Sequence, residues 1–442
     1  MDSSTKSILL ELLNFSHSLN QKLYVVGGTL RDYLSRKPGT DFDLTGKHAA
    51  ELGSNFARSL NFTCVPLDNS PGRQTVRVIL NQNQHLDFTD LQGKNIEEDL
   101  SQRDFTINAM GLLLSDFLSG RKNIIDPHKG QDDLKNRKIR VLSGPIFQSD
   151  PLRMLRAFRF AATLEFKIDE ETLVKISHHK SILMESAQER IWHELKLFLK
   201  TQHTISLLQT FQSSGILECL FPASDKNFSK TYPQYQKLES LLNEPEKTFP
   251  EYANELSAEC ITENQYLLKI AVLLKGIKQK ENKEAWEIPY SDSSVVKEWN
   301  IRPNNAEVKF INQTLSGAWY LSEMYSKRNH GLDELFELSK KMGEELPASV
   351  IFFNSGSGLK DVALFCNDIL KFYYHQFLPM MSNIALLDGK DIIHQFGLSP
   401  SPLFGKILHY VQKAQVLGNI TTHEEAIALA EDIIQSQLTE SE

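Results

Sequence analysis

The sequence has few of the features that mark secreted, membrane or fibrous proteins. Its four cysteines, at positions 64, 219, 260 and 366, show no paired spacing, which argues against a disulfide framework or a zinc knuckle and favours a reducing cytoplasm. No stretch approaches the ~20 apolar residues that a membrane span needs. The first residues lack a basic segment and a small-residue cleavage site, so we expect a first helix there and not a signal peptide.

The chain also lacks an excess of positive charge. Lysine and arginine number 48 against 56 acidic residues, and the formal net charge is −8 at pH 7. Phosphate contacts dominate nucleic-acid binding, so this balance gives no support for such a partner, although a local basic surface would suffice. The length of 442 residues and a hydrophobic content of 41% indicate a globular protein of about two to four units.

Two kinds of periodicity divide the chain. Short β-branched or alternating runs at 22–28, 77–80 and 85–91 lie among helical patterns in the first part of the chain, which predicts a small mixed sheet with helices. From about residue 146 the pattern is helical almost throughout. We therefore expect an α+β fold in which an all-helical remainder follows the mixed head.

The segment GTDFDLTG places Asp41 and Asp43 two residues apart in an extended run. Side chains at i and i+2 of a strand lie on the same face, so both carboxylates should project together while Phe42 and Leu44 face the core. Adjacent carboxylates repel each other and gain from a shared cation, and their oxygen atoms favour Mg²⁺. Such a pair taken alone is more often a solvated strand face.

Just upstream, a predicted strand leads into Gly27 and Gly28 and then into a helix with Arg31 and Asp32 in its first turn. Glycines at such a turn let backbone N–H groups approach an anion at the helix N-terminus. A simple turn is the common alternative, and Asp32 could merely complement the helix dipole.

Several segments in order carry a family resemblance. GGTLRD and TDFDL together resemble the nucleotidyltransferase motif of the DNA polymerase β superfamily, and RDFTINAM resembles the next motif of class II tRNA nucleotidyltransferases. Two further segments, 126–142 and 150–166, resemble later motifs of these CCA-adding enzymes, whose relatives add CC, add A or make poly(A). The resemblance extends over residues 22–200 and continues weakly beyond them.

The resemblance implies a polymerase β-like nucleotidyltransferase head, then a neck with a base-recognition helix, a helical body with a degenerate HD-like region, and a helical tail that contacts tRNA. These four parts would cover residues 1–145, 146–200, 201–355 and 356–442. In the body, Lys275 and Gly276 stand where relatives with a phosphohydrolase domain carry a His-Asp pair, so no metal site is implied there.

The resemblance also assigns roles in the head. Asp41 and Asp43 would hold two Mg²⁺ ions, one lowering the pKa of the RNA 3′-hydroxyl and the other binding the triphosphate. Asp87 would be either a third carboxylate or an outward-facing strand residue. Gly28 and Arg31 would contact the triphosphate.

Arg103 and Asp104 would contact the incoming nucleotide, including its ribose hydroxyls. Their alternative is a surface ion pair beside a short helix capped by Thr106. Gln102 stands where relatives usually carry another arginine, and Ser149 where they usually carry glutamate.

The helix predicted at 150–160 would read the base. Asp150 and Pro151 should form its N-cap and first position, and Asp150 should meet Arg153 at i and i+3. A carboxylate beside a guanidinium complements the donor–acceptor edges of cytosine and adenine and opposes those of guanine and uracil, at ~1–3 kcal/mol for each unmatched buried polar group. Arg156 and Arg159 would extend toward the triphosphate; the alternative is a solvated basic stripe.

A later helical segment, 186–199, resembles the neck helix of the family. Its Glu189, Arg190 and Glu194 should stabilise that helix and its nucleotide-binding neighbour.

Only the segment 92–99 separates Leu91 from Leu100, whereas relatives that add a full CCA usually carry a longer loop. The resemblance therefore favours the CC-adding branch, acting on the tRNA 3′ end with CTP, and with ATP if A is also added. The alternatives are a full CCA-adding enzyme, an A-adding enzyme, a poly(A) polymerase, a small-molecule nucleotidyltransferase or an inactive RNA-binding relative. We expect a cytoplasmic protein with no membrane and no DNA partner.

Overall fold

The structure is a computed structural model that describes residues 3–439, except 38, 40, 71–73, 223–227, 276–299, 329, 358–360 and 383–384. The chain forms two compact units, Met1–Cys219 and Leu220–Glu442. The first combines a sheet with helices, and the described part of the second is helical. The predicted α+β class is therefore confirmed, while the finer division into four parts stays a prediction.

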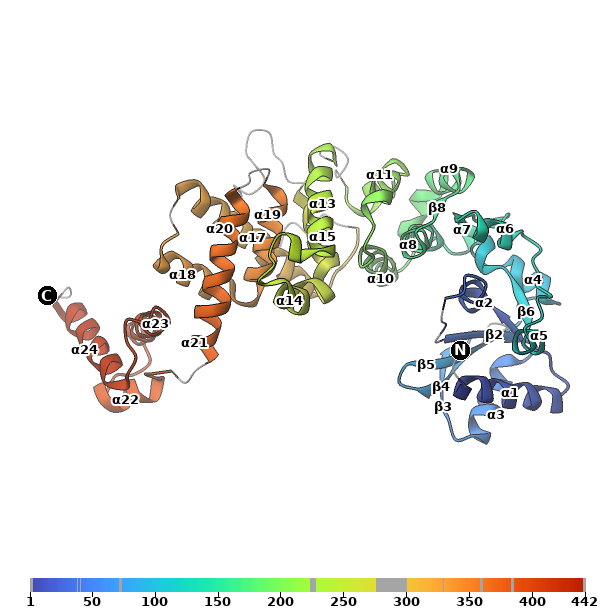
Figure 1. The fold of residues 1–442 in the computed structure, drawn as a ribbon, viewed down its shortest axis with the longest axis horizontal. Helices are drawn as coiled ribbons and strands as arrows, with labels where there is room; N and C mark the ends of the chain where they lie inside the picture. Colours follow the sequence, from blue (N-terminus) through green and yellow to red (C-terminus); the bar gives the residue numbers. More distant parts are fainter. Residues whose placement is uncertain are drawn as a thin grey trace. The chain divides into compact units, whose positions relative to one another are not determined.

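A six-stranded sheet forms the centre of the head (Figure 1). Its strand order is β3-β4-β5-β2-β1-β6, in which only the β2–β5 pair is parallel. That parallel pair requires a crossover, which α3, β3 and β4 provide. The strands are β1 Tyr24–Val26, β2 Asp41–Gly46, β3 Thr63–Asp68, β4 Thr75–Asn81, β5 Gln84–Asp90 and β6 Gly111–Leu113.

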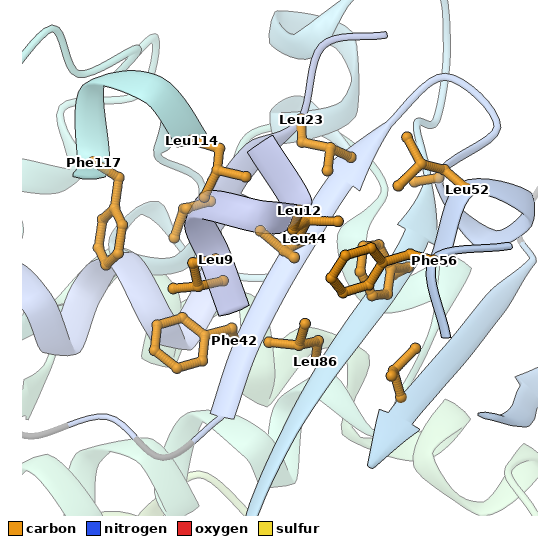
Figure 2. Packing of buried hydrophobic residues seen from close by; sticks show 14 of the residues in the cluster. Leu9, Leu12, Leu23, Phe42, Leu44, Leu52, Phe56, Leu86, Leu114 and Phe117 are labelled. Atoms are coloured by element: carbon orange, nitrogen blue, oxygen red, sulfur yellow. The ribbon is translucent and has the colours of Figure 1, made fainter. Parts of the chain in front are cut away.

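One face of this sheet carries the core of the head. Helices α1 (Ser3–Ser18) and α3 (Ala49–Ser59) supply Leu9, Leu12 and Phe56, which gather with Leu44 and Leu86 of the sheet (Figure 2). The period-2 expectation for β2 is confirmed, since residues 42 and 44 are 3% and 1% exposed. Asp41 and Asp43 of β2 and Asp87 of β5 therefore project from the opposite face.

Further along this unit, buried aromatic rings join three helices. Helix α8 packs against α10 and α11, where the Phe158 ring meets those of Phe198 and Phe211 at centroid distances of 6.2 and 4.9 Å. The shorter helices that precede α8 in the chain are α2 Gly27–Leu34, α4 Ile96–Ser101, α5 Leu114–Ser119, α6 Gly130–Lys135 and α7 Ile146–Ser149. The others are α8 Arg153–Leu164, α9 Glu170–His179, α10 Gln188–Leu199, α11 Ile205–Ser213 and α12 Ile216–Leu220, with a two-stranded sheet of β7 Lys138–Ile139 and β8 Lys167–Ile168.

The second unit is built on helix packing with one buried ion pair. Lys269 and Glu239, 2.9 Å apart, are 0% and 2% exposed. Its main helices are α13 Phe228–Asn243, α14 Ala253–Leu256, α15 Thr262–Lys275, α17 Asn305–Lys327, α18 Leu332–Met342, α19 Leu346–Gly356, α20 Asp361–Phe372, α21 Leu378–Ser382, α22 Gly389–Phe396, α23 Pro402–Val416 and α24 His423–Thr439. Lys275 ends α15, and Gly276 of the predicted degenerate site lies outside the described residues.

Among the described residues, no helix combines the length and the apolar character needed to cross a membrane.

Candidate active site

The predicted carboxylate pair lies on the open face of the sheet beside a third carboxylate. In the parallel register of β2 and β5, Asp43 lies opposite Asp87 and Asp41 lies opposite His85. Partners in such a register project from the same face. The structure therefore brings all three carboxylates together, as the strand pattern predicted for the first two.

Asp43 is held close to the glycine turn. The backbone N–H of Gly28 donates to its Oδ2 at 3.1 Å. Gly27 has a φ of +62°, and a Cβ there would lie 3.0 Å from the same oxygen, so only glycine suits this position. Burial raises the pKa of Asp43; the charge of Arg103 opposes this shift and that of Asp87 adds to it.

The third carboxylate, Asp87, is already paired with a neighbouring arginine. Arg77 on β4 donates from Nε and Nη2 to the two oxygens of Asp87, each at 2.8 Å. Asp41 is about half exposed and lies 3.1 Å from His85 Nδ1. Asp87 therefore has a fixed partner, which favours the reading of a paired strand residue over that of a metal ligand.

The remaining pair, Asp41 and Asp43, fits a divalent cation. Both side chains offer hard oxygen donors on one strand face, and the burial and like charge that raise the pKa of Asp43 are what a bound cation would offset. Among the described residues, no group of three or more His, Cys, Asp or Glu side chains forms a ready metal site, so any further ligands would come from substrate or water.

A cleft of about 810 Å³ joins the sheet to helix α8. Asp43 lines it from the sheet, and Asp150 and Arg153 line it from the start of α8. The predicted metal ligand Asp43 and the predicted base-reading residues Asp150 and Arg153 therefore line the same cleft. Other predicted residues along its wall are Gly28, Arg31, Arg103, Asp104 and Arg156, whereas Asp41 and Arg159 are not among the lining residues.

Arg31 lies behind the glycine turn. Its guanidinium donates to both oxygens of Asp32 at 2.9 and 3.0 Å and to Asn108 Oδ1 at 2.9 Å. The prediction that Arg31 and Asp32 occupy the first turn was wrong, because the helix already begins at Gly27, with Val26 in the extended N-cap position. The arginine therefore lines the cleft from the second turn.

Asp104 is almost fully buried, with 5% exposure. Its Oδ1 accepts from the N–H of Phe105 at 2.8 Å and from Asn108 Nδ2 at 3.1 Å, and its Oδ2 accepts from two nitrogens of Arg156 at 2.9 and 2.5 Å. Burial alone would raise the pKa of Asp104, but the charge of Arg156 and these hydrogen bonds hold it below its usual value.

The four donors fill the acceptor sites of the Asp104 carboxylate. A ribose contact would require one of them to move.

The cap expected at Thr106 lies one residue earlier, since the short 3₁₀ turn Thr106–Asn108 has Phe105 as its N-cap. The Thr106 hydroxyl instead donates to Asp133 Oδ2 at 2.7 Å.

The two later arginines of α8 have carboxylate partners within the protein. Arg156 binds Asp104, as above, and Arg159 Nε donates to Glu194 Oε2 on α10 at 2.8 Å. Both guanidinium groups lie over the Phe160 ring, at 5.2 and 4.4 Å from its centroid, in the range of cation–π contacts. Of these two arginines, Arg156 lines the cleft and Arg159 does not. Their predicted contact with a triphosphate stays a prediction.

Each member of the predicted base-reading pair has partners that the sequence did not indicate. Arg153 donates to the carbonyl oxygens of Gln102 at 2.9 Å and Arg103 at 3.4 Å and to Ser149 Oγ at 3.3 Å. Asp150 lies 3.7 Å from the guanidinium of Arg190.

The expected N-cap was two residues too early, because α8 begins at Arg153. Asp150 nevertheless accepts from the N–H of Leu152 at 3.3 Å within the turn that precedes the helix. Sequence reasoning did not identify Arg190 as a cleft residue, and no spacing rule could have, since it comes from another helix.

Two segments match protein-family models. Residues 23–140 match the poly A polymerase head domain, and residues 165–228 match a model described as a probable RNA and SrmB-binding site of polymerase A. The chain is 29% identical over 413 residues to the CC-adding tRNA nucleotidyltransferase of Geobacter sulfurreducens, covering 91% of this chain and 90% of the relative. It is 24% identical to the A-adding tRNA nucleotidyltransferase of Halalkalibacterium halodurans, with coverages of 96% and 92%.

Solved structures share the fold along almost the whole chain. A CCA-adding enzyme in complex with ATP has a TM-score of 0.71 at 22% identity and covers 99% of this chain and 95% of its own. The Thermotoga maritima CCA-adding enzyme complexed with tRNA has a TM-score of 0.68 at 23% identity, with coverages of 99% and 96%.

Proposed function

From the premise that the chain belongs to the class II tRNA nucleotidyltransferase and poly(A) polymerase family, we propose that it adds two C residues to the 3′ end of tRNA. CTP is the nucleotide donor and pyrophosphate is the leaving group. The reaction needs no nucleic-acid template, because side chains of the protein select the base.

One observation carries this proposal. The carboxylate of Asp43, the phosphate-compatible turn at Gly28 and the acid–guanidinium groups of Asp150 and Arg153 line a single cleft. One ribonucleotide can then place its triphosphate at the sheet and its base at α8. A catalytically inactive RNA-binding relative would have no need of this combination.

Residues of the chain have distinct tasks in the reaction. Asp41 and Asp43 would hold Mg²⁺, which stabilises charge on the transferring phosphoryl group and lowers the pKa of the attacking hydroxyl. Arg31, fixed by Asp32 and Asn108, contributes positive charge on the triphosphate side. This charge favours the leaving pyrophosphate.

Base selection follows from the chemistry of the α8 pair. An ionised Asp150 only accepts hydrogen bonds and Arg153 only donates them. Together they match the N4 amino group and N3 acceptor of cytosine, and the reversed edge of uracil would set like groups against each other. Asp104 fixes Arg156 within the wall of the cleft, so we assign Asp104 to positioning. The predicted ribose contact would require one of its present donors to move.

The choice of CC over CCA rests on a short connection. β5 ends at Asp90 and α4 begins at Ile96, and the connection between them is tied to α4 by a hydrogen bond from the Lys94 N–H to Glu98 at 2.8 Å. This leaves little chain for a separate mobile loop. Relatives named for CC addition fit the same choice, and the A-adding relatives define the alternative.

The proposal also covers the RNA substrate and the cellular location. We propose tRNA as the substrate contacted by the helical parts, including the tail at 356–442, and the cytoplasm as the location. Lys413 of the tail binds Asp333 at 2.6 Å, so its charge already has a partner within the protein.

The test uses purified protein and a tRNA transcript that ends at the discriminator base. Incubation with CTP alone should extend the transcript by two residues and then stop, and subsequent ATP should add nothing. Addition of a terminal A would identify a CCA-adding enzyme, growth only on tRNA that already ends in CC would identify an A-adding enzyme, and a long A tract would identify a poly(A) polymerase. No incorporation of any nucleotide would contradict the proposal.

A further inference from the structure

Asp99 is a buried acid on α4, the helix that precedes the RDFTINAM segment, and no role has yet been given to it. It is 3% exposed. Its Oδ2 accepts from Arg103 Nε at 3.2 Å and Nη2 at 2.9 Å, and its Oδ1 accepts from the backbone N–H of Gln92 at 2.9 Å. One carboxylate therefore binds both an arginine of the cleft and the connection that follows β5.

Arg103, the arginine held by Asp99, lies in the wall of the cleft beside the glycine turn. Arg103 lines the cleft, and its Nη1 lies 3.2 Å from the position that a Cβ on Gly27 would take. Its charge also counteracts the rise in the pKa of Asp43. Arg103 thus lies beside the glycine turn and acts electrostatically on the carboxylate side of the cleft.

The backbone of the same short segment supports the opposite wall. The carbonyl oxygens of Gln102 and Arg103 accept from the Arg153 guanidinium at 2.9 and 3.4 Å. The segment anchored by Asp99 therefore places the Arg103 guanidinium beside the glycine turn. Its two carbonyl oxygens hold Arg153 on the opposite wall.

We propose that Asp99 is a positioning residue for nucleotide binding, acting through Arg103 and through the backbone that orients Arg153. The inference rests on the proposed function, since it names a residue of the same site. Helix capping does not account for Asp99, because the N-cap of α4 is Asn95, whose side chain accepts from Glu98. An ion pair that only stabilises the fold is the alternative to be separated by experiment.

The first experiment compares Asp99→Asn with the wild-type protein. The variant keeps the shape of the side chain but removes the charge from bonds that are stronger when one partner is ionised. The KM for CTP should rise about tenfold, while kcat with tRNA stays within about twofold, because Asp99 acts on binding and does not touch reacting atoms. Asp99→Glu should recover part of the loss.

Asp116→Asn is the matched control. Asp116 is also a buried acid of the head, 6% exposed, and it accepts from Asn123 at 3.0 Å, but it does not line the cleft. It should leave the KM for CTP unchanged. A fall in melting temperature alone, equal in the two asparagine variants and without a change in KM, would overturn the proposal.

A double-mutant cycle tests the route through Arg103. If Asp99 acts through this side chain, Asp99→Asn combined with Arg103→Lys should raise KM by much less than the product of the two single effects. Fully multiplicative effects would contradict the route.

Calorimetric titration with CTP separates the positioning role from the proposed function. Wild-type protein that binds CTP but adds nothing to tRNA would refute the proposed activity. A weaker affinity of Asp99→Asn for CTP would still support the positioning role.

If Asp99→Asn does not fold, Asp99→Glu is measured in its place. A changed KM for CTP with a preserved kcat would support the role, and an unchanged KM would refute it.

Discussion

The two walls of the cleft differ in how their charges are arranged. On the sheet, Asp43 lies opposite Asp87, and burial together with this like charge outweighs Arg103 in raising the pKa of Asp43. On the helical side, Arg156 meets Asp104, whose pKa is held below its usual value. The sheet wall thus keeps an unfavourable interaction that a cation would relieve, whereas the helical wall is already stabilised by its own ion pairs.

The two walls of the cleft therefore differ in whether their charges are balanced before a ligand binds. The sheet wall needs its ligand, so changes there should damage activity more than stability. The helical wall is preorganised by the protein, so changes there should damage stability together with nucleotide selection.

The largest expected effect is on the sheet wall. Asp43→Asn should reduce nucleotide incorporation by roughly a thousandfold or more, equivalent to about 4 kcal/mol of barrier, because it removes one of the two proposed metal ligands. The free energy of unfolding should stay the same or rise at neutral pH, since the repulsion with Asp87 disappears. Single-turnover incorporation and urea denaturation measure the two quantities; a folded variant with full activity would show that the metal assignment is wrong.

The next effect tests the ion pair of the helical wall. Asp104→Asn should lower the free energy of unfolding by about 1–3 kcal/mol at pH 7, because Arg156 loses its nearest carboxylate. Its side chain is one third exposed and stays 3.7 Å from Glu194, which limits the loss. Urea denaturation gives this difference directly. Loss of less than about 1 kcal/mol would indicate that the pair is no stronger than a surface salt bridge.

The same pair predicts a pH dependence with a definite sign. The folded-state pKa of Asp104 is lowered, so its stabilising contribution is fully present above the unfolded-state pKa of about 3.9 and is lost as the pH falls through the lower folded-state value. The stability difference between wild type and Asp104→Asn should therefore be constant from pH 7 to pH 5 and shrink below pH 4. A difference that grows on acidification would contradict the assignment.

A smaller effect concerns base choice. Asp150→Asn offers both a donor and an acceptor and can match either cytosine or uracil. The ratio of kcat/KM for CTP over UTP should fall about tenfold, which corresponds to one unmatched polar group at ~1–3 kcal/mol. If the ratio is unchanged, Asp150 does not read the base.

The smallest effect on activity is expected at Arg159. It does not line the cleft and is bound to Glu194, so Arg159→Lys should leave the KM for CTP within about twofold and reduce stability by about 1 kcal/mol. Arg156→Lys, a neighbour on the same helix that lines the cleft, is the matched comparison and should raise KM further. Equal effects on KM would remove the distinction between the two arginines.

The sequence predicted the faces of the elements better than the partners of the side chains. The period of two in a strand fixed Asp41 and Asp43 on one face and Phe42 and Leu44 in the core, because that relation is local. The helical character of residues after 146 was equally readable from periodicity. The family motifs also led to the shared cleft, since they occur in the order that the fold brings together.

The partner of Arg156 could not be predicted, because Asp104 lies 52 residues away. Glu194 was expected to stabilise the helix next to its own, but the sequence did not say that its partner there is Arg159, 35 residues away. The carbonyl groups that hold Arg153 leave no trace in residue identity. The start of α8 was placed two residues early because Asp150 is a good capping residue, and only the backbone shows that it serves a preceding turn.

The most direct test of a shared site is a crystal structure with CTP and a divalent cation. We expect the triphosphate at the glycine turn with the cation bound by Asp41 and Asp43, and the cytosine edge at Asp150 and Arg153. A nucleotide whose base lies away from α8 while its phosphates contact the sheet, or the reverse, would contradict the account.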